Sequence, residues 1–343
     1  MRSRGGKLTR WGIAPILVLL SALLFSGCEQ GVPTFLNPSG PAAKTESDLF
    51  WIILGIATVI FVAVTSFLVF SIIRYRDRPG SRPAQQIHGN TTLELIWTIV
   101  PSIVLLVVLI FTITYIDALA LPTTANTLHV RAIGHQWWWE FQYERADPQV
   151  VTADELHVPV GTNVNVDLSS DNVIHSLWVP ELAGKTDVIP GHNNQLQFRA
   201  DRAGSYRGEC TEYCGTQHAN MNFIVIAQSP SDYASWLQGQ QLEAAAAVTT
   251  QQQSGQALFL HQGCVACHNI AGVAPVGQKV GPNLTHFGSR QLIAGWVLSN
   301  TPENLATWLA NPQAVKSGSD MVLAQPLTPD QISDLVAYLE NLK

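Results

Sequence analysis

The sequence predicts a membrane protein with three parts: a two-helix transmembrane hairpin, an all-β domain and a small all-α domain. Three observations predict it: two long uncharged apolar segments, a series of short β-prone segments separated by turn residues, and helical periodicity near the C-terminus. Of the 343 residues, 47% are hydrophobic and only 13% are charged, a share well below that of an average soluble domain. The net charge of −6 argues against nucleic-acid binding, because phosphate contacts need clustered lysine and arginine.

The N-terminus has the pattern of an export signal. The stretch "MRSRGGKLTRWGIAPILVLLSALLFSGC" combines a basic start, an apolar centre and small residues before Cys28. We expect residues 1–27 to be a signal peptide and residues 28–48 to form an extracytoplasmic segment. The ending "FSGC" resembles a bacterial lipoprotein cleavage site, at which Cys28 becomes the lipid-modified first residue. If the signal is an uncut anchor, Cys28 has no such role.

The two apolar segments, residues 50–73 and 95–116, each exceed the roughly 18 apolar residues that suggest a membrane-spanning helix. We assign residues 49–117 to a transmembrane hairpin. The segment between them, "RYRDRPGSRPAQQIHGN", contains four arginines and one aspartate. The positive-inside rule places this loop in the cytoplasm. The rest of the chain is therefore expected on the extracytoplasmic face of a bacterial cell membrane, periplasmic or outer.

Short β-prone segments with turn residues between them fill residues 127–228 and predict an all-β sandwich or barrel over residues 118–232. Residues 233–252 are rich in Ala, Gln and Thr, which indicates a domain boundary, either a flexible linker or an alanine-rich helix. Beyond it, "TPENLATWLANP" and "TPDQISDLVAYLENLK" begin with threonine caps and carry apolar residues at helical spacing. Residues 253–343 are therefore expected to form a small helical domain.

The helical domain contains "CVACH", residues 264–268, the pattern that attaches a c-type haem covalently. Cys264 and Cys267 would form thioether bonds to the porphyrin, and His268 would bind the iron. A haem that only carries electrons has a sixth ligand, and a methionine sulfur in that position raises its reduction potential. Met321 is our candidate, and His286 is the alternative.

The same two cysteines could instead form half of a zinc site, with His261 and His286 completing the four ligands. An exported chain, a helical frame and a downstream methionine favour the haem. The domain resembles a small class I cytochrome c, in which the terminal helix packs near the haem-bearing helix.

The stretch "CTEYCGTQHANM", residues 210–221, concentrates side chains that bind metals. Three interpretations compete: a disulfide between Cys210 and Cys214, an exchangeable copper-delivery site, and a redox copper site. A delivery site would suit a thioredoxin-like α/β fold, and this region has no βαβ pattern. Thiolate, imidazole and thioether ligands suit both oxidation states of copper, and His175 in "DNVIHSLWVP" offers a second imidazole.

This combination resembles the dicopper CuA centre of cytochrome c oxidase subunit II. The six matching positions are His175, Cys210, Glu212, Cys214, His218 and Met221. In that family the thiolates bridge the coppers, each histidine binds one copper, the methionine supplies a weak contact, and the glutamate binds through its main-chain carbonyl. The resemblance covers roughly residues 45–230 and implies a cupredoxin-like fold. Quinol-oxidising relatives lack the copper ligands, and a fused cytochrome c domain resembles a bacterial branch of the family.

The resemblance implies roles for three further side chains. Trp137, the first tryptophan in "GHQWWWEFQY", matches the residue at which electrons enter, although aromatic packing in a β domain also explains it. Glu94, at the cytoplasmic end of the second apolar segment, matches a glutamate at the mouth of a proton path. A solvated carboxylate favoured by the helix dipole is the alternative. The carboxylate of Glu212 matches a ligand of Mg²⁺ at the interface with the catalytic subunit.

The function implied is that of the subunit through which electrons reach a proton-pumping terminal oxidase. They would pass from an external donor, such as a cytochrome c or an upstream respiratory complex, to the tethered haem and then to the copper pair. Haem in subunit I, the catalytic haem-copper subunit, would receive them next, and other oxidase subunits would complete the assembly. Two alternatives remain: a membrane-anchored electron carrier for another reductase, and a copper-transfer protein.

Overall fold

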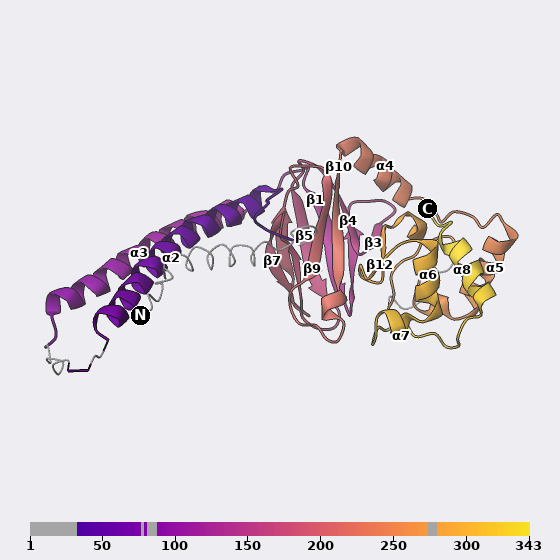
Figure 1. Ribbon diagram of the computed structural model, residues 1–343. Helices are drawn as coiled ribbons and strands as arrows, with labels where there is room; N and C mark the ends of the chain where they lie inside the picture. The colour runs from indigo at the N-terminus through magenta and orange to yellow at the C-terminus, as the bar shows by residue number, and fades with distance from the viewer. Residues whose placement is uncertain (1–32, 77–78, 81–87, 274–279) are drawn as a thin grey trace, which may run out of the picture. The chain divides into compact units, whose positions relative to one another are not determined.

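Figure 1 shows the computed structural model of the chain, which describes residues 33–76, 79–80, 88–273 and 280–343. The predicted signal peptide and the predicted lipidation site Cys28 lie outside the described residues, as does part of the arginine-rich loop. Thr34–Lys343 form one compact unit.

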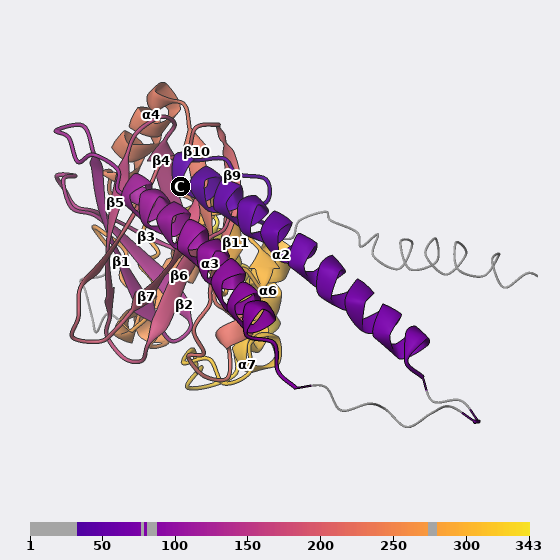
Figure 2. The same cartoon turned by 90° about the vertical axis from the view of Figure 1, so that its left-hand side faces the viewer.

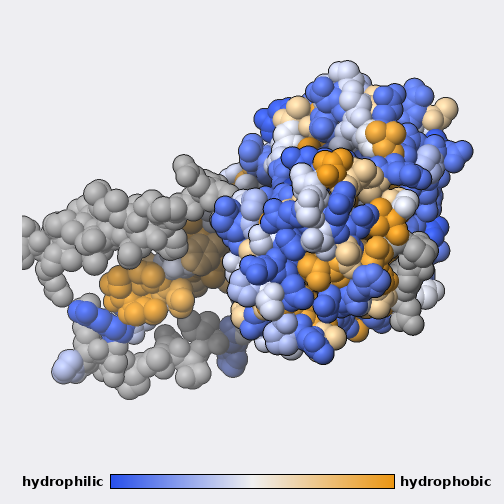
Figure 3. Space-filling model, turned by 90° about the vertical axis from the view of Figure 1, so that its right-hand side faces the viewer, coloured by the Kyte–Doolittle hydropathy of each residue, from blue (hydrophilic) through white to orange (hydrophobic). Residues whose placement is uncertain are grey.

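Two long apolar helices, α2 (Pro41–Arg74) and α3 (Thr91–Leu119), form the predicted hairpin and extend beyond the apolar segments at both ends. Pro41 begins α2, and the side chain of Asn90 caps α3 by accepting hydrogen bonds from two amides of the first turn. Each helix is long and apolar enough to cross a membrane. The helices lie side by side (Figure 2), and most of their large apolar side chains are exposed, as expected for a surface that faces lipid or partner helices. Hydrophilic residues predominate over the extramembrane domains on the face drawn in Figure 3.

The start of α2 is hydrogen-bonded to the β domain. The amide of Ser39 donates to the carbonyl of Glu181 at 2.7 Å, and the amide of Ala43 donates to the carbonyl of Leu182 at 3.2 Å. Arg202 donates from Nη2 to the Ser39 hydroxyl at 2.6 Å. These contacts join the first turn of a membrane helix directly to the sandwich that follows it in sequence.

The β domain is a sandwich of two five-stranded sheets, with strand orders β3-β2-β1-β5-β8 and β4-β10-β9-β6-β7. The strands are β1 (Leu128–His135), β2 (Trp138–Tyr143), β3 (Val150–Ala153), β4 (Glu155–Pro159), β5 (Val164–Ser170), β6 (His175–Val179), β7 (Ala183–Val188), β8 (Asn194–Phe198), β9 (Gly204–Cys210) and β10 (Asn222–Gln228). Strands β1 and β5 pair in parallel, as do β4 and β10. Residues from both sheets, including Trp139, Phe141 and Phe223, pack in one core between them.

Helix α4 and a connecting segment lie at the predicted boundary, and the helical domain follows them. Helix α4 (Pro230–Gln240) ends ten residues before α5 (Thr250–His261) begins, and residues 244–247, all alanine, lie between these helices. Helices α6 (Pro302–Ala310), α7 (Pro312–Val315) and α8 (Pro329–Leu339) complete the domain, with the two-residue strands β11 (Leu292–Ile293) and β12 (Leu298–Ser299).

The predicted helix starts of this domain are found where expected. Thr301 caps α6, and Thr328 forms a capping box with Gln331 at the start of α8. Helix α5 packs against α8, with the rings of Phe259 and Tyr338 6.1 Å apart. The terminal helix therefore lies against the helix that leads into the CxxCH motif.

Candidate copper and haem sites

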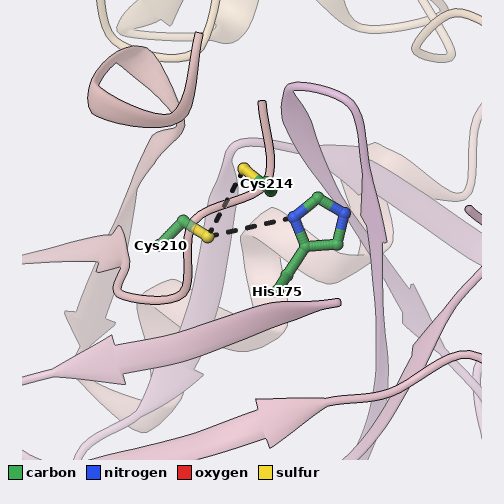
Figure 4. Close-up of side chains that lie close together, drawn as sticks. All are labelled: His175, Cys210 and Cys214. Atoms are coloured by element: carbon green, nitrogen blue, oxygen red, sulfur yellow. Dashed lines mark hydrogen bonds between the residues drawn. The ribbon is translucent and has the colours of Figure 1, made fainter. Parts of the chain in front are cut away.

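The candidate copper site lies where two neighbouring strands of one sheet meet a loop. His175 is the first residue of β6, and Cys210 is the last residue of β9, which pairs with β6. The loop between β9 and β10 brings Cys214 back toward both residues (Figure 4). Strand pairing therefore converts a separation of 35 residues in sequence into a contact.

Five of the six predicted ligand side chains have their metal-binding atoms in one place. The sulfur of Cys210 lies 3.8 Å from the sulfur of Cys214 and 3.8 Å from Nδ1 of His175. The sulfur of Cys214 lies 3.6 Å from Nδ1 of His218 and 3.7 Å from the sulfur of Met221. Both cysteines are free, and a disulfide would need a sulfur separation of about 2.05 Å. The disulfide interpretation is therefore not supported.

Glu212 presents its main chain to the site. The sulfur of Cys210 lies 3.3 Å from the carbonyl oxygen of Glu212. This is the atom through which the family resemblance predicts a metal contact, whereas the half-buried carboxylate belongs to the separate Mg²⁺ prediction.

The imidazole of His175 is oriented for metal binding. Its Nε2 lies 3.1 Å from Oδ1 of Asn172, an atom that can only accept, so Nε2 carries the hydrogen and Nδ1 keeps its lone pair. Nδ1 is the nitrogen that faces Cys210, as Figure 4 shows. The ring is fully buried and packs edge-on against Trp139, at 5.8 Å between ring centres.

The protonation states of the two thiols are coupled. The contact between the two sulfurs lowers the pKa of Cys210, against the opposing effect of burial, and His175 lowers it further. The same contact raises the pKa of Cys214, and burial adds to this increase. The pair therefore carries one negative charge readily, and a bound cation is needed to remove the second proton. The donor set is soft and buried, and it fits copper.

The candidate haem site is a cavity of about 260 Å³ in the helical domain. Its wall includes Cys264, Cys267, His268 and Met321, together with many apolar side chains. All four residues predicted to hold a haem therefore face one cavity. Trp137 of the β domain also lines it.

His268 is prepared to bind iron. Its Nδ1 lies 2.8 Å from the carbonyl of Pro282, so Nδ1 is the donor and Nε2 is free. Burial lowers the pKa of His268, which keeps the ring neutral. Gly281 lies against this ring, and a Cβ there would be 2.6 Å from Cε1 of His268. The residues present thus fit a covalently held haem.

The cavity distinguishes between the two candidates for the sixth haem ligand. Met321 lines it, and Gln313 holds its loop by donating to the Met321 carbonyl at 3.1 Å. His286 is directed elsewhere, with Nε2 3.1 Å from the carbonyl of Leu242. Among the described residues, potential metal ligands of the His, Cys, Asp and Glu types converge at the copper site. Within this described part of the chain they do not converge at the CxxCH motif, which disfavours the zinc interpretation.

The three consecutive tryptophans have different surroundings. Trp139 is fully buried in the sandwich, whereas Trp137 and Trp138 are partly exposed. The indole Nε1 of Trp137 donates to the carbonyl of Cys214 at 3.0 Å. Gly215 follows with φ +120°, and a Cβ there would be 2.9 Å from the Trp137 ring. Trp137 therefore lies directly on the copper loop, and its predicted role remains a prediction.

Glu94 is exposed in the first turn of α3. A carboxylate there interacts favourably with the helix dipole, so its position agrees with both interpretations, and its link to a proton path also remains a prediction.

Sequence reasoning missed three buried charged residues, Asp154, Glu155 and Lys316, and the partly buried Arg290. Asp154 and Glu155 belong to the β domain, and Arg290 and Lys316 belong to the helical domain. No motif contains them, because a charge is buried by tertiary packing rather than by local pattern.

Three family models match the chain. "Cytochrome C oxidase subunit II, transmembrane domain" matches residues 30–114, and "Cytochrome C oxidase subunit II, periplasmic domain" matches residues 144–228. "Cytochrome c" matches residues 252–343. The three matches follow the order hairpin, sandwich and helical domain.

Individual relatives and one solved structure are similar to this chain. "Cytochrome c oxidase subunit 2" of Alkalihalophilus pseudofirmus is 36% identical over 345 residues, covering 97% of this chain and 98% of the relative. "Quinol oxidase subunit 2" of Bacillus subtilis is 33% identical over 244 residues, covering 68% of this chain and 74% of the relative. A crystal structure of the periplasmic domain of cytochrome oxidase subunit II from Bradyrhizobium japonicum covers 35% of this chain and 95% of its own, at 28% identity and a TM-score of 0.33.

The fold and the two sites define a membrane-anchored electron-transfer protein that joins a cupredoxin-like domain to a cytochrome c domain. The chain belongs to the cytochrome c oxidase subunit II family. It is thus a subunit of an oxidoreductase, and the family implies CuA, haem c and assembly with catalytic oxidase subunits. The predicted fold class is confirmed. We refer to residues 127–228 as the copper domain and to residues 250–343 as the haem domain.

Proposed function

We propose that this chain is the subunit through which electrons enter a respiratory cytochrome c oxidase that reduces oxygen and pumps protons. The observation that carries the proposal is the convergence of Cys210, Cys214, His175, His218 and Met221 at one buried point. A thiol pair flanked by two imidazoles and a thioether has the donors that a copper pair requires.

Two sets of residues would hold the cofactors. The copper set is His175, Cys210, Glu212, Cys214, His218 and Met221, and the haem set is Cys264, Cys267, His268 and Met321. When bound, the two groups supply carriers of single electrons. The protein keeps the copper ligands in place through the pairing of β6 with β9, and it excludes water by burying both thiols.

Trp137 would connect the two sites. It donates a hydrogen bond to the carbonyl of Cys214, and it lines the cavity that contains Cys264 and Cys267. This arrangement supports electron passage from the haem side to the copper side, with an external donor reducing the haem. Fusion of the two domains also replaces diffusion of a separate donor by a high effective concentration.

The remaining roles follow from the family and are part of the same proposal. The catalytic haem-copper subunit would accept electrons from the copper pair and would contact α2 and α3. Glu94 would lie at the mouth of a proton path, the carboxylate of Glu212 would bind Mg²⁺ at the subunit interface, and Cys28 would carry a lipid. Both extramembrane domains would lie on the extracytoplasmic face.

The two alternative functions differ from the proposed one in the exposure of the copper ligands that they require or in the partner protein. A copper-transfer protein needs ligands that a partner can reach, yet His175 is 0%, Cys214 3% and Cys210 6% exposed. A carrier for another reductase would have the same sites and would purify without a haem-copper subunit. Matches to quinol oxidase subunits do not favour quinol oxidation, because this chain retains the complete copper ligand set and a haem motif.

Metal and haem analysis of the purified full-length protein tests the proposal. We expect a copper pair whose unpaired electron is shared between both nuclei, and a c-type haem spectrum that survives denaturation because the haem is covalent. A mononuclear copper signal, or copper that a chelator removes rapidly from the folded protein, would contradict it.

A further inference from the structure

Lys316, which follows α7 in the haem domain, is buried although its side chain is charged, with 4% of the residue exposed. Its Nζ donates to the main-chain carbonyls of Trp137 at 2.7 Å, Asn220 at 2.8 Å and Ala294 at 3.0 Å. The first two carbonyls belong to the copper domain and the third belongs to the haem domain. Because an ammonium group has three N–H donors, this arrangement saturates it.

A buried ammonium group makes this contact specific. Removing a charge from water is costly unless each donor is paired, so Lys316 tolerates burial only while all three carbonyls are present. Burial lowers the pKa of Lys316 to about 8, and the nearby carboxylate of Asp154 in the copper domain opposes this decrease. If the domains separated, Lys316 would lose two of its three acceptors, and those two carbonyls would lose their donor.

Hydrogen bonds donated by main-chain amides cross between the same two domains. The carboxylate of Glu155 accepts from the amides of Gln291 at 2.6 Å and Leu292 at 3.2 Å. The amide of Asn222 donates to the carbonyl of Gly295 at 3.2 Å. We call this contact the domain seam; its residues are Trp137, Glu155, Asn220, Asn222, Gln291, Leu292, Ala294, Gly295 and Lys316.

Apolar side chains reinforce the domain seam. Leu292 of the haem domain is buried with Ile224 and Ile226 of β10, and Trp296 packs against this cluster. The guanidinium of Arg207 lies 5.4 Å from the centre of the Trp296 ring. The domain seam therefore combines an apolar centre with paired polar groups, as a specific interface does.

We propose that Lys316 is the positioning residue that docks the haem domain on the copper domain and so fixes Trp137 between the two redox sites. The predicted effect on electron transfer rests on the proposed function, whereas the docking of the two domains does not. Trp137 is held at two points: Lys316 binds its carbonyl, and the carbonyl of Cys214 binds its indole. Without Lys316, the main chain of Trp137 loses one of these restraints.

Amide hydrogen exchange of the full-length holoprotein tests the docking. In Lys316→Met, a side chain of similar length without donors, we expect exchange at Gln291, Leu292 and Asn222 to accelerate by roughly tenfold to hundredfold, the factor implied by losing one or two hydrogen bonds to a charged group. Amides in the β1–β2 pair should exchange as in the wild type. Lys185→Met, at an exposed position of β7, is the matched control and should change neither region.

Electron transfer supplies the second readout. With copper and haem spectra unchanged, the rate at which electrons pass from a flash-reduced haem to copper should fall at least about tenfold in Lys316→Met and stay at the wild-type value in Lys185→Met. A merely structural lysine would alter stability without changing this rate in the folded protein.

Gly295→Ala perturbs the three carbonyls around Lys316 from the haem-domain side and serves as a second variant in case Lys316→Met does not fold. A Cβ at Gly295, where φ is +70°, would be 2.6 Å from Nζ of Lys316 and 2.7 Å from the Asn220 carbonyl. It should accelerate the same amides. Wild-type protection and a wild-type rate in either folded variant would overturn the proposal. A wild-type protein without a copper pair would instead refute the proposed function, and exchange at the domain seam would still decide the docking.

Discussion

Asp154→Asn gives a quantitative test of the charges beside the domain seam. Asp154 is 7% exposed, and burial raises the pKa of its carboxyl group from the ordinary 3.8 to about 6. A hydrogen bond from the Trp139 amide and the charges of Lys316 and Arg290 lower the pKa but do not cancel the effect of burial. Asparagine keeps the acceptor for Trp139 and tolerates the φ of +59° at this position, so the substitution removes mainly the titration.

The sign of the effect follows from proton binding. Between about pH 3.8 and pH 6 the folded protein keeps the Asp154 proton while the unfolded chain releases it. The contribution of Asp154 to the free energy of unfolding is therefore fully present below pH 3.8 and is lost as the pH rises through about 6. The difference between the two pKa values corresponds to about 3 kcal/mol.

Denaturant unfolding of the copper domain within the full-length protein, followed by tryptophan fluorescence, measures this contribution. Relative to the wild type, Asp154→Asn should gain about 2 to 3 kcal/mol of unfolding free energy between pH 4 and pH 7. Asp187→Asn, at an exposed position of β7, is the control. A stability difference between Asp154→Asn and the wild type that is the same at both pH values would refute the argument that burial sets this pKa.

Three further substitutions test the two sites. His218→Ala should alter or abolish the copper spectrum and leave the haem spectrum intact, as optical and electron-spin spectroscopy can show; loss of both spectra would mean that the sites are not independent. Gly281→Ala places a methyl group 2.6 Å from Cε1 of His268 and should lower the unfolding free energy of the haem domain by about 1 to 3 kcal/mol, measured by haem absorbance during denaturation. An unchanged value would mean that the ring has room to move. Gly215→Ala places a methyl group 2.9 Å from Trp137 and should change its fluorescence and slow haem-to-copper transfer, whereas an unaltered rate would separate Trp137 from the route.

Sequence patterns could predict the copper site because most of its ligand residues lie close together in the sequence. Four of its side chains lie within the twelve residues 210–221, and a strand end with His175 supplies the fifth. Their spacing reflects the geometry of one loop and its neighbouring strand, so local sequence carries the information. The haem motif is likewise contiguous, and the capping residues Thr301 and Thr328 act within one helical turn.

The parts that could not be predicted depend on packing between distant segments. Strand β7 contains Gly184 and Lys185, which are unfavourable in strands, so local composition does not indicate it. The choice between Met321 and His286 needed the shape of the cavity. The burial of Lys316 depends on three carbonyls separated in sequence by up to 157 residues, from Trp137 to Ala294, and no local pattern reports such a cage.

Anomalous X-ray diffraction at the copper absorption edge, on crystals of the copper-loaded protein, tests the central claim most directly. Two adjacent copper peaks between the sulfurs of Cys210 and Cys214, one toward His175 and the other toward His218, are the predicted result. A single peak, peaks elsewhere, or a covalent bond between the two sulfurs would contradict the account.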